Sequence, residues 1–419
     1  MMPPFTPIMA PLQADNGSQK NSTASFKQHT LDSAFQPIYS IAHRRPVGYE
    51  ALIRPYTPAG DPISPLHLFS TSAHDEAEAV ALDRLCRQLH LANFTRQEED
   101  EHWLFLNVNP RVAVGGKKYG AFFQHLLEHY NFPPERVVIE ILENAIDDEK
   151  DLVTAAGYYR DLGCLIAIDD FGAGHSNFNR IWRIRPDIVK LDRSIIVKAE
   201  ENPFVRRVFP NLVGLIHESG SLALSEGIET EAQAIVAMDA GIDLVQGYLL
   251  GKPHASIDVH ADTMQIIPHL CNKYREFYEA ESQRTATRLQ HYVDLFGRAA
   301  QSVADGISLS HSCAELLQHP LVERCFLLDE EGQQTEPNII PSGRNQLEDR
   351  RFAPVSDARG AIWSRRHYFR KAMAQPEHIQ ITRPYLSIIG ATMCITLSIA
   401  LQTNGQTRVF CCDLSWEEV

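Results

Sequence analysis

The chain has 419 residues, of which 44% are hydrophobic and 22% are charged, the balance of a soluble globular protein. It carries 39 basic and 53 acidic residues, a net charge of −14. We therefore do not expect it to bind long nucleic acids, because such binding requires basic groups to neutralise many phosphates. The length predicts two or three domains.

The eight cysteines are scattered and form no Cys-x-x-Cys pair, so neither a zinc motif nor a redox motif is indicated. Reduced thiols and a cytoplasmic location fit this usage. The N-terminus lacks the basic and then apolar layout of a signal peptide. Residues 1–30 are rich in Pro, Ser, Asn and Gln, and we expect them to form a disordered tail.

Residues 31–262 alternate short apolar runs with amphipathic stretches. This alternation predicts an α/β fold with a mainly parallel sheet, most simply a TIM-type barrel. The expected strands are Val47–Ile53, Trp103–Val108, Val137–Ile141, Leu165–Ile168, Ile188–Leu191, Leu222–Ser225 and Leu244–Tyr248.

Residues 263–308 are predicted to form linking helices, broken or kinked near Pro268. An apolar stripe within them recurs at spacings of three and four residues. It is typical of a short coiled coil and equally of a helix that packs on the surface of a domain. The stripe consists of Leu289, Tyr292, Phe296, Ala299 and Val303.

Residues 309–419 are predicted to form a smaller α+β domain with an antiparallel sheet. The segment Tyr385–Gln402 is uncharged for 18 residues, near the length of a membrane-spanning helix. Its Thr and Ile content favours buried strands, so we expect no membrane span. The expected strands are Cys325–Leu328, Ile379–Ile381, Met393–Leu401 and Val409–Leu414.

Polar residues lie at or near the ends of nearly all the barrel strands, which meet at one rim. One such residue, Asp169 for example, is more often a helix cap than a ligand. Five carboxylates at one rim would repel one another unless cations occupied the site. Oxygen ligands favour Mg²⁺ or Mn²⁺, and adjacent aspartates suit two ions. The rim residues are Glu50, Asn107, Glu140, Asp169, Asp170, Lys190, Glu226 and Gln246.

Several motifs in this region, in matching order and spacing, resemble the EAL family of cyclic-di-GMP phosphodiesterases. The motifs are Tyr49-Glu50-Ala51-Leu52-Ile53-Arg54, Asn107-Val108-Asn109-Pro110, Glu140-Ile141-Leu142-Glu143, Asp169-Asp170-Phe171-Gly172-Ala173-Gly174, Lys190-Leu191-Asp192, Glu226-Gly227-Ile228-Glu229 and Gln246-Gly247. The resemblance implies an enzyme that hydrolyses cyclic-di-GMP to linear 5′-pGpG with two Mg²⁺ or Mn²⁺ ions. It also implies a homodimer.

The resemblance also implies a role for each residue. Arg54 would contact a substrate phosphate and Leu52 would lie against the substrate. Glu143 would hold the loop after Asp170 in place. Lys190 would orient or activate the attacking water, and Glu226, Glu229 and Gln246 would complete the catalytic set. The implied metal ligands are Glu50, Asn107, Glu140, Asp169, Asp170 and Glu226.

The C-terminal region resembles sensor domains of the Cache class, which have a PAS-like fold. The resemblance lies in Arg366-His367-Tyr368-Phe369, Arg383-Pro384-Tyr385 and the strand that ends near Asp413. It implies a pocket for an unknown small molecule, which would regulate the phosphodiesterase. The alternative is a domain that only dimerises and whose aromatic residues form its core. The candidate pocket residues are Trp363, Tyr368, Tyr385 and Asp413.

Two other functions remain as alternatives. A catalytically silent receptor would bind cyclic-di-GMP and signal through protein contacts, but such receptors lack some of the metal-binding acids or the lysine. An unrelated metal-dependent barrel hydrolase would share the fold without sharing all the motifs. The complete set of residues favours the phosphodiesterase.

Overall fold

The computed structural model describes residues 10–14, 21–97, 102–108, 122–142, 149–174, 178–257, 265–342, 358–387 and 392–416. The chain divides into two compact units, unit 1 (Met1–Glu276) and unit 2 (Phe277–Val419). Each unit has its own hydrophobic core.

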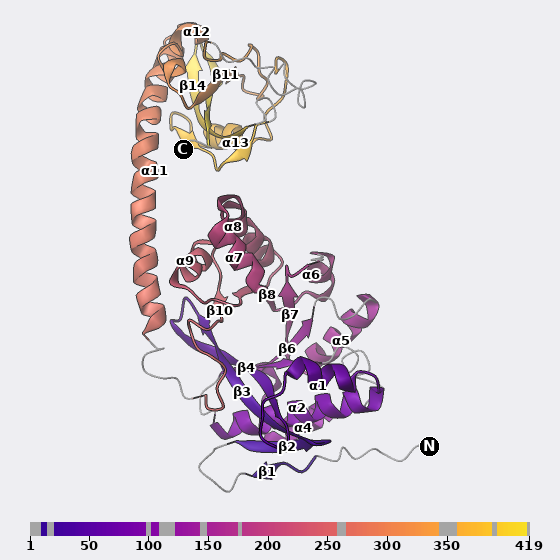
Figure 1. The fold of residues 1–419 in the computed structure, drawn as a ribbon. Helices are drawn as coiled ribbons and strands as arrows, with labels where there is room; N and C mark the ends of the chain where they lie inside the picture. Colours follow the sequence, from indigo (N-terminus) through magenta and orange to yellow (C-terminus); the bar gives the residue numbers. More distant parts are fainter. Residues whose placement is uncertain are drawn as a thin grey trace. The chain divides into compact units, whose positions relative to one another are not determined.

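Unit 1 contains a closed barrel of eight strands among the described residues (Figure 1). The first, β3 (His29–Ser40), pairs antiparallel with β4 and β10 and closes the barrel, whereas the neighbouring pairs from β4 to β10 are parallel. The predicted TIM-type barrel is therefore confirmed, with one strand reversed. The other strands are β4 (Arg45–Tyr56), β5 (Trp103–Asn107), β6 (Val137–Leu142), β7 (Leu165–Phe171), β8 (Ile188–Leu191), β9 (Leu222–Ser225) and β10 (Leu244–Val245).

Helices surround this barrel (Figure 1). Alternate strand residues point inward and outward: Phe105 packs inside the barrel, whereas Leu104 and Leu106 face the helices. Local caps start some of the helices, as at Thr230, whose side chain forms a capping box with Gln233. The helices are α1 (Pro65–Ser72), α2 (Glu76–Gln97), α4 (Phe122–Tyr130), η1 (Pro134–Arg136), α5 (Glu149–Asp161), α6 (Phe178–Ile184), α7 (Arg193–Glu201), α8 (Pro203–Glu218) and α9 (Glu231–Asp239).

The predicted disordered tail is wrong for part of residues 1–30. The short strand β1 (Gln13–Ala14) pairs with β2 (Ser22–Phe26), and β2 pairs antiparallel with β3. Ala24 and Phe26 are buried, and the side chain of Asn93 bonds both the N–H and the carbonyl of Ser22. Tertiary contacts therefore order a segment whose composition is typical of disorder.

The helix α11 (Ile266–Ala304) is continuous where a break was expected. Pro268 lies in its first turn, where the missing N–H costs no helical hydrogen bond. The apolar stripe packs against the sheet of unit 2, and the rings of Phe296 and Phe410 stack at 4.7 Å. The structure therefore supports the interpretation in which the stripe packs on the surface of a domain.

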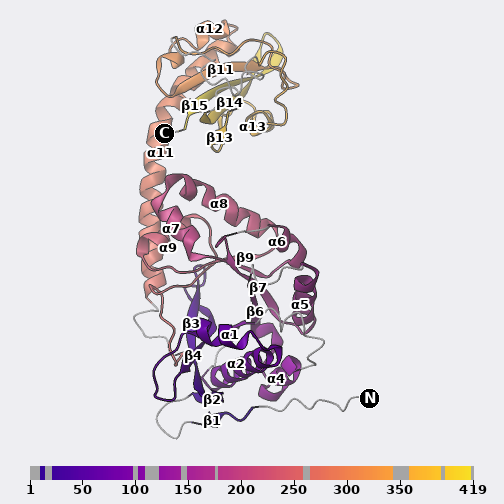
Figure 2. The same ribbon diagram turned by 45° about the vertical axis from the view of Figure 1, so that its right-hand side comes forward.

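Unit 2 is built on an antiparallel sheet, in which Figure 2 labels β11, β15, β14 and β13. The strand order is β11-β15-β14-β12, with β13 also on β14. One face packs on α11 and the other on α13. The expected buried strand within Tyr385–Gln402 is confirmed for β14, whereas the two residues of β13 are half-buried and exposed. In the described part of the chain, no helix is both long and apolar enough to cross a membrane. The elements are α12 (Leu309–Ser312), η2 (Leu316–Gln318), β11 (Val322–Leu328), α13 (His367–Ala374), β12 (Gln380–Ile381), β13 (Tyr385–Leu386), β14 (Met393–Thr403) and β15 (Gln406–Ser415).

Candidate active site

A buried lysine lies among four carboxylates at the rim of the barrel. The side chain of Lys190, at the end of β8, is 1% exposed. Its Nζ atom lies within ion-pair distance of one oxygen of each carboxylate, and these oxygens come from four different parts of the barrel. The distances are 2.5 Å to Glu140, 2.6 Å to Glu226, 3.0 Å to Asp169 and 3.7 Å to Glu50.

Two amide side chains hold the carboxylate of Glu50. Asn107 donates from Nδ2 to Oε1 at 2.9 Å, and Gln246 donates from Nε2 to Oε2 at 2.8 Å. The two donors come from the ends of β5 and β10, on opposite sides of β4 and β3 in the barrel. Glu50 is therefore fixed in position before any ligand binds.

A β-bulge brings Asp170 to the same site as Asp169. Adjacent residues of a regular strand point to opposite faces, but the pairing of β7 with β8 shifts between Ile168 and Phe171. Asp170 has φ 58, a left-handed conformation that Asp tolerates better than most residues. As a result, carboxylate oxygens of Asp169, Asp170 and Glu226 lie within 4.8 Å of one another.

The packing of acids in this cluster perturbs their protonation. Burial and the neighbouring Glu50 raise the pKa of Glu140 well above its usual range. Burial also raises the pKa of Glu226 to about 8, although Lys190 acts in the opposite direction. Burial and Asp169 raise the pKa of Asp170. Burial opposes the charge on Lys190, but the surrounding carboxylates outweigh it and raise its pKa well above the usual value.

These residues fit divalent cations. Apart from their ion pairs with Lys190, both carboxylate oxygens of Glu140 and Oδ1 of Asp169 are buried without a hydrogen-bond partner in the described part of the chain. Buried acceptors of this kind cost free energy unless a proton or a cation reaches them. The donors are carboxylate and amide oxygens, which hard ions such as Mg²⁺, Mn²⁺ and Ca²⁺ prefer.

The remaining predicted residues lie around this cluster or apart from it. Glu229 is half exposed, and its carboxylate pairs with Arg193 at 2.7 Å instead of joining the cluster. Arg54 lies beyond Glu50 on β4, where its Nη1 donates to the carbonyl of Ile53 at 3.0 Å. Glu143 lies outside the described residues.

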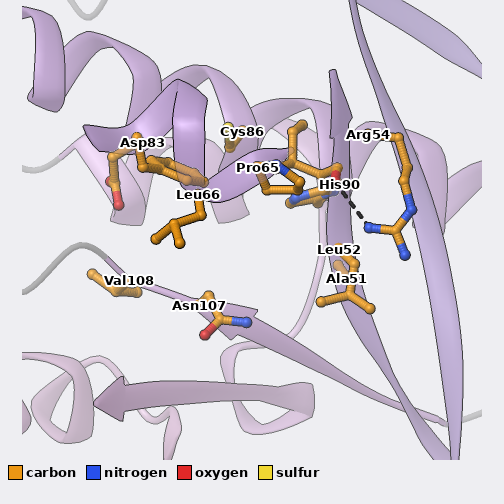
Figure 3. A pocket seen from close by; sticks show the side chains of 12 residues that line it. Ala51, Leu52, Arg54, Pro65, Leu66, Asp83, Cys86, His90, Asn107 and Val108 are labelled. Carbon is orange, nitrogen blue, oxygen red and sulfur yellow. Dashed lines mark hydrogen bonds between the residues drawn. The ribbon is translucent and has the colours of Figure 1, made fainter. Parts of the chain in front are cut away.

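A cavity of about 350 Å³ reaches Asn107, whose amide donates to Glu50 of the acid cluster. Figure 3 shows the side chains that line the cavity. Arg54 and Leu52 on β4 line it, as the resemblance implies for substrate-binding residues. Sequence reasoning missed the opposite wall, which α1 and α2 provide with Leu66 and His90 among others. Leu66 and His90 belong to helices that contain none of the motifs, so no motif indicated them.

The four candidate pocket residues of unit 2 lie on one side of its sheet. The rings of Tyr368 and Tyr385 stack at 6.3 Å, and Arg366 lies 5.9 Å from the rings of both Tyr385 and Trp363. Asp413 is 1% exposed and joins Tyr385 through the hydroxyl of Thr396. The structure therefore brings this predicted group together.

The model of the EAL domain family matches residues 19–253. The chain belongs to the EAL family. The matched region contains the acid cluster, Lys190 and Arg54, so the family assignment and the geometry concern the same site. The resemblance of the motifs to the EAL family is therefore confirmed.

Three comparisons illustrate the relationship. The uncharacterized EAL-domain protein YkuI of Bacillus subtilis is 26% identical over 348 residues, covering 80% of this chain and 82% of YkuI. The crystal structure of YkuI with the substrate c-di-GMP and calcium has a TM-score of 0.75 at 23% identity, covering 92% of this chain and 96% of YkuI, a likeness of fold. The cyclic di-GMP phosphodiesterase PdeF of Escherichia coli is 29% identical over 227 residues, 53% of this chain but 30% of PdeF.

Proposed function

We propose that this protein hydrolyses cyclic-di-GMP to linear 5′-pGpG with the help of divalent cations. The observation that carries the proposal is the complete rim cluster, in which Lys190 lies within 3.7 Å of four carboxylates. Relatives that share this domain include PdeF and PdeB of Escherichia coli, named a phosphodiesterase and a probable phosphodiesterase of cyclic di-GMP. The adjoining cavity offers the substrate an apolar wall and Arg54.

The net charge of the acid cluster favours two divalent ions. The site holds five carboxylates, Glu50, Glu140, Asp169, Asp170 and Glu226, and the single cation Lys190. When all are ionised their net charge is −4, which two divalent cations would neutralise. The close group of Asp169, Asp170 and Glu226 would hold one ion, with Glu50, Glu140 and Asn107 beside the other. We propose Mg²⁺ or Mn²⁺ as the resident ions.

The cations would supply Lewis-acid stabilisation of charge on the phosphoryl oxygens and a water of lowered pKa. Lys190 provides a fixed positive charge. In the metal-free protein the surrounding carboxylates raise its pKa, so Lys190 is protonated there and donates hydrogen bonds. Its proposed role is to orient the attacking water. Asn107 and Gln246 keep Glu50 in position. Arg54 holds a substrate phosphate at the mouth of the cavity.

The alternative is a catalytically silent receptor of cyclic-di-GMP. Such a protein has no need for a complete set of buried acids around a buried lysine, an arrangement that costs free energy in the absence of a ligand. Here Glu50, Glu140, Asp169, Asp170, Glu226 and Lys190 are all in place. The enzyme is therefore the function that the site supports best.

The test is incubation of the purified protein with cyclic-di-GMP and Mg²⁺, Mn²⁺ or a chelator, with the nucleotides separated by chromatography. We expect pGpG to appear only with the metals. Glu50→Gln should lower the rate more than the 10- to 100-fold typical of a supporting residue. The matched control is Glu78→Gln, the same change at an exposed glutamate that pairs with Lys27. Retained binding without any product would establish the receptor instead.

We further propose that unit 2 is a PAS-like domain that senses a small molecule and regulates hydrolysis. The observation in its favour is the group of Trp363, Tyr368, Tyr385 and Asp413 on one side of its sheet. We also propose a homodimer, and a cytoplasmic location, which suits eight free and mostly buried thiols. Analytical ultracentrifugation of the full chain tests the dimer.

A further inference from the structure

Unit 2 contains a buried guanidinium that uses only one of its three nitrogens. Arg324 lies on β11, where the pairing with β15 shifts, and its side chain is 10% exposed. Nη2 contacts Oδ2 of Asp413 at 2.5 Å and donates to Oγ of Ser387 at 2.9 Å. A guanidinium has five N–H donors, of which three belong to Nε and Nη1. Both atoms are buried and have no hydrogen-bond partner among the described residues.

Asp413 does not reach Nε or Nη1 of Arg324. Its Oδ2 atom is already paired with Arg324, and its Oδ1 atom accepts a hydrogen bond from Oγ1 of Thr396 at 2.6 Å. Because Thr396 gives its only hydroxyl hydrogen to Asp413, the hydroxyl of Tyr385, 2.6 Å away, donates to Thr396. The chain of hydroxyls therefore ends on Oδ1 of Asp413. The Oδ2 atom has only its ion pair with Nη2, and Nε and Nη1 of Arg324 are left unpaired among the described residues.

The charged side chains around Arg324 also favour an added anion. Arg324 and Asp413 neutralise one another, but a second cation, Arg366, lies 5.9 Å from the ring of Tyr385. The three groups carry a net charge of +1. One negative charge would balance them, whereas a buried water would provide an acceptor and no charge.

The surrounding side chains indicate what kind of anion fits. Arg324 lies over the ring of Phe326 at 5.4 Å, and Phe326 packs edge-on against Tyr368, which stacks on Tyr385. Apolar walls of this kind suit a carbon body next to the charged group. A phosphate monoester carries close to two charges at neutral pH and needs more donors, whereas a carboxylate carries one charge on two oxygens that match a guanidinium.

We propose that unit 2 binds a small monocarboxylate, with the carboxylate on Arg324 and its carbon body against Tyr368 and Tyr385. The proposal rests on the sensory role proposed above for this unit and gives that role a chemical class of ligand. Arg324 is the specificity-determining residue. Arg366 assists through its charge at the side where Trp363 and Tyr385 lie.

The experiment uses the full chain and measures binding by calorimetry and by the shift of the melting temperature. The probes are sodium formate, acetate, propionate and benzoate, with chloride and phosphate at equal ionic strength. We expect saturable binding of at least one carboxylate and none of chloride or phosphate. Arg324→Lys keeps a charge beside Asp413 but loses the planar donors, so it should weaken binding at least tenfold.

A second variant leaves the buried pair intact. Arg366→Gln should also weaken binding, whereas Arg370→Gln, an exposed arginine one turn further along α13, should not. The proposal is overturned if none of the four carboxylates binds. It is also overturned if the wild type, Arg324→Lys and Arg366→Gln all bind a carboxylate equally. Because calorimetry needs no cyclic-di-GMP, this outcome is distinct from a failure of hydrolysis. An effect of the bound carboxylate on the rate of pGpG formation is a separate measurement, which tests regulation.

Discussion

Loading the acid cluster with metal should expel protons. Burial raises the pKa of Glu226 to about 8, with Asp169 adding to the shift and Lys190 opposing it. At pH 7 its carboxyl group is therefore protonated in about 0.9 of the metal-free molecules, and at pH 9 in about 0.1. Metal ions bind the ionised carboxylate, so binding should release about 0.9 proton from this residue at pH 7 and almost none at pH 9. Glu140 adds to the release, because its pKa is also raised.

Titration of Mg²⁺ or Mn²⁺ into the metal-free protein, in buffers of different ionisation enthalpy, measures this release directly. Glu226→Gln should remove about 0.9 proton from the value at pH 7. The control is Glu78→Gln, since Glu78 pairs with Lys27 away from the cluster, and its replacement should leave the release unchanged. Equal heats in all buffers at pH 7 would refute the reasoning, because Glu226 would then be ionised without any metal.

Three further predictions test the site and the fold. Chemical denaturation of the metal-free protein should show that its stability falls by up to about 5 kcal/mol as pH rises from about 4.5 to about 8. The reason is that Glu226 in the folded protein keeps a proton that the unfolded chain has released. Saturating Mg²⁺ should flatten this dependence on pH. Gly247→Ala would place a Cβ atom 2.1 Å from the carbonyl oxygen of Ile228 and should destabilise the fold by at least about 1–3 kcal/mol in urea melts; an unchanged midpoint would contradict that close approach. Phe296→Ala should cost about 3–5 kcal/mol, because its ring is fully buried on Phe410, whereas a coiled-coil role predicts a change of oligomeric state in sedimentation.

The parallel strands of the barrel were predictable because both of their faces are buried. Such strands are continuous apolar runs, as in Val137–Ile141, where every residue except Glu140 is apolar. The strand β3 was missed because its sequence includes Asp32 and Pro37, and proline in a run argues against a central strand. The pattern of apolar residues does not indicate whether a strand runs parallel or antiparallel to its neighbours. The reversed β3 therefore had to come from the structure.

The rule that active sites lie at strand ends located most of the acid cluster, because it depends only on where each strand stops. It could not locate effects of local backbone geometry. Asp170, still within β7, reaches the site through a β-bulge, and Glu229, beyond the end of β9, pairs with Arg193. The wall of the cavity made by α1 and α2 depends on packing between helices, which no motif encodes.

Arg324 was missed for a related reason, since a single arginine in a strand is usually a half-exposed residue with its charged group in water. Its importance follows from burial beside Asp413 with donors to spare. The charged groups of the two sites are unbalanced in opposite directions. Around Lys190 the buried acids outnumber the bases, and the deficit of positive charge favours cations. Around Arg324 and Arg366 the bases outnumber Asp413, and the excess favours an anion. In each unit, charged groups that the fold leaves without a full set of partners indicate the kind of ligand that would pair with them.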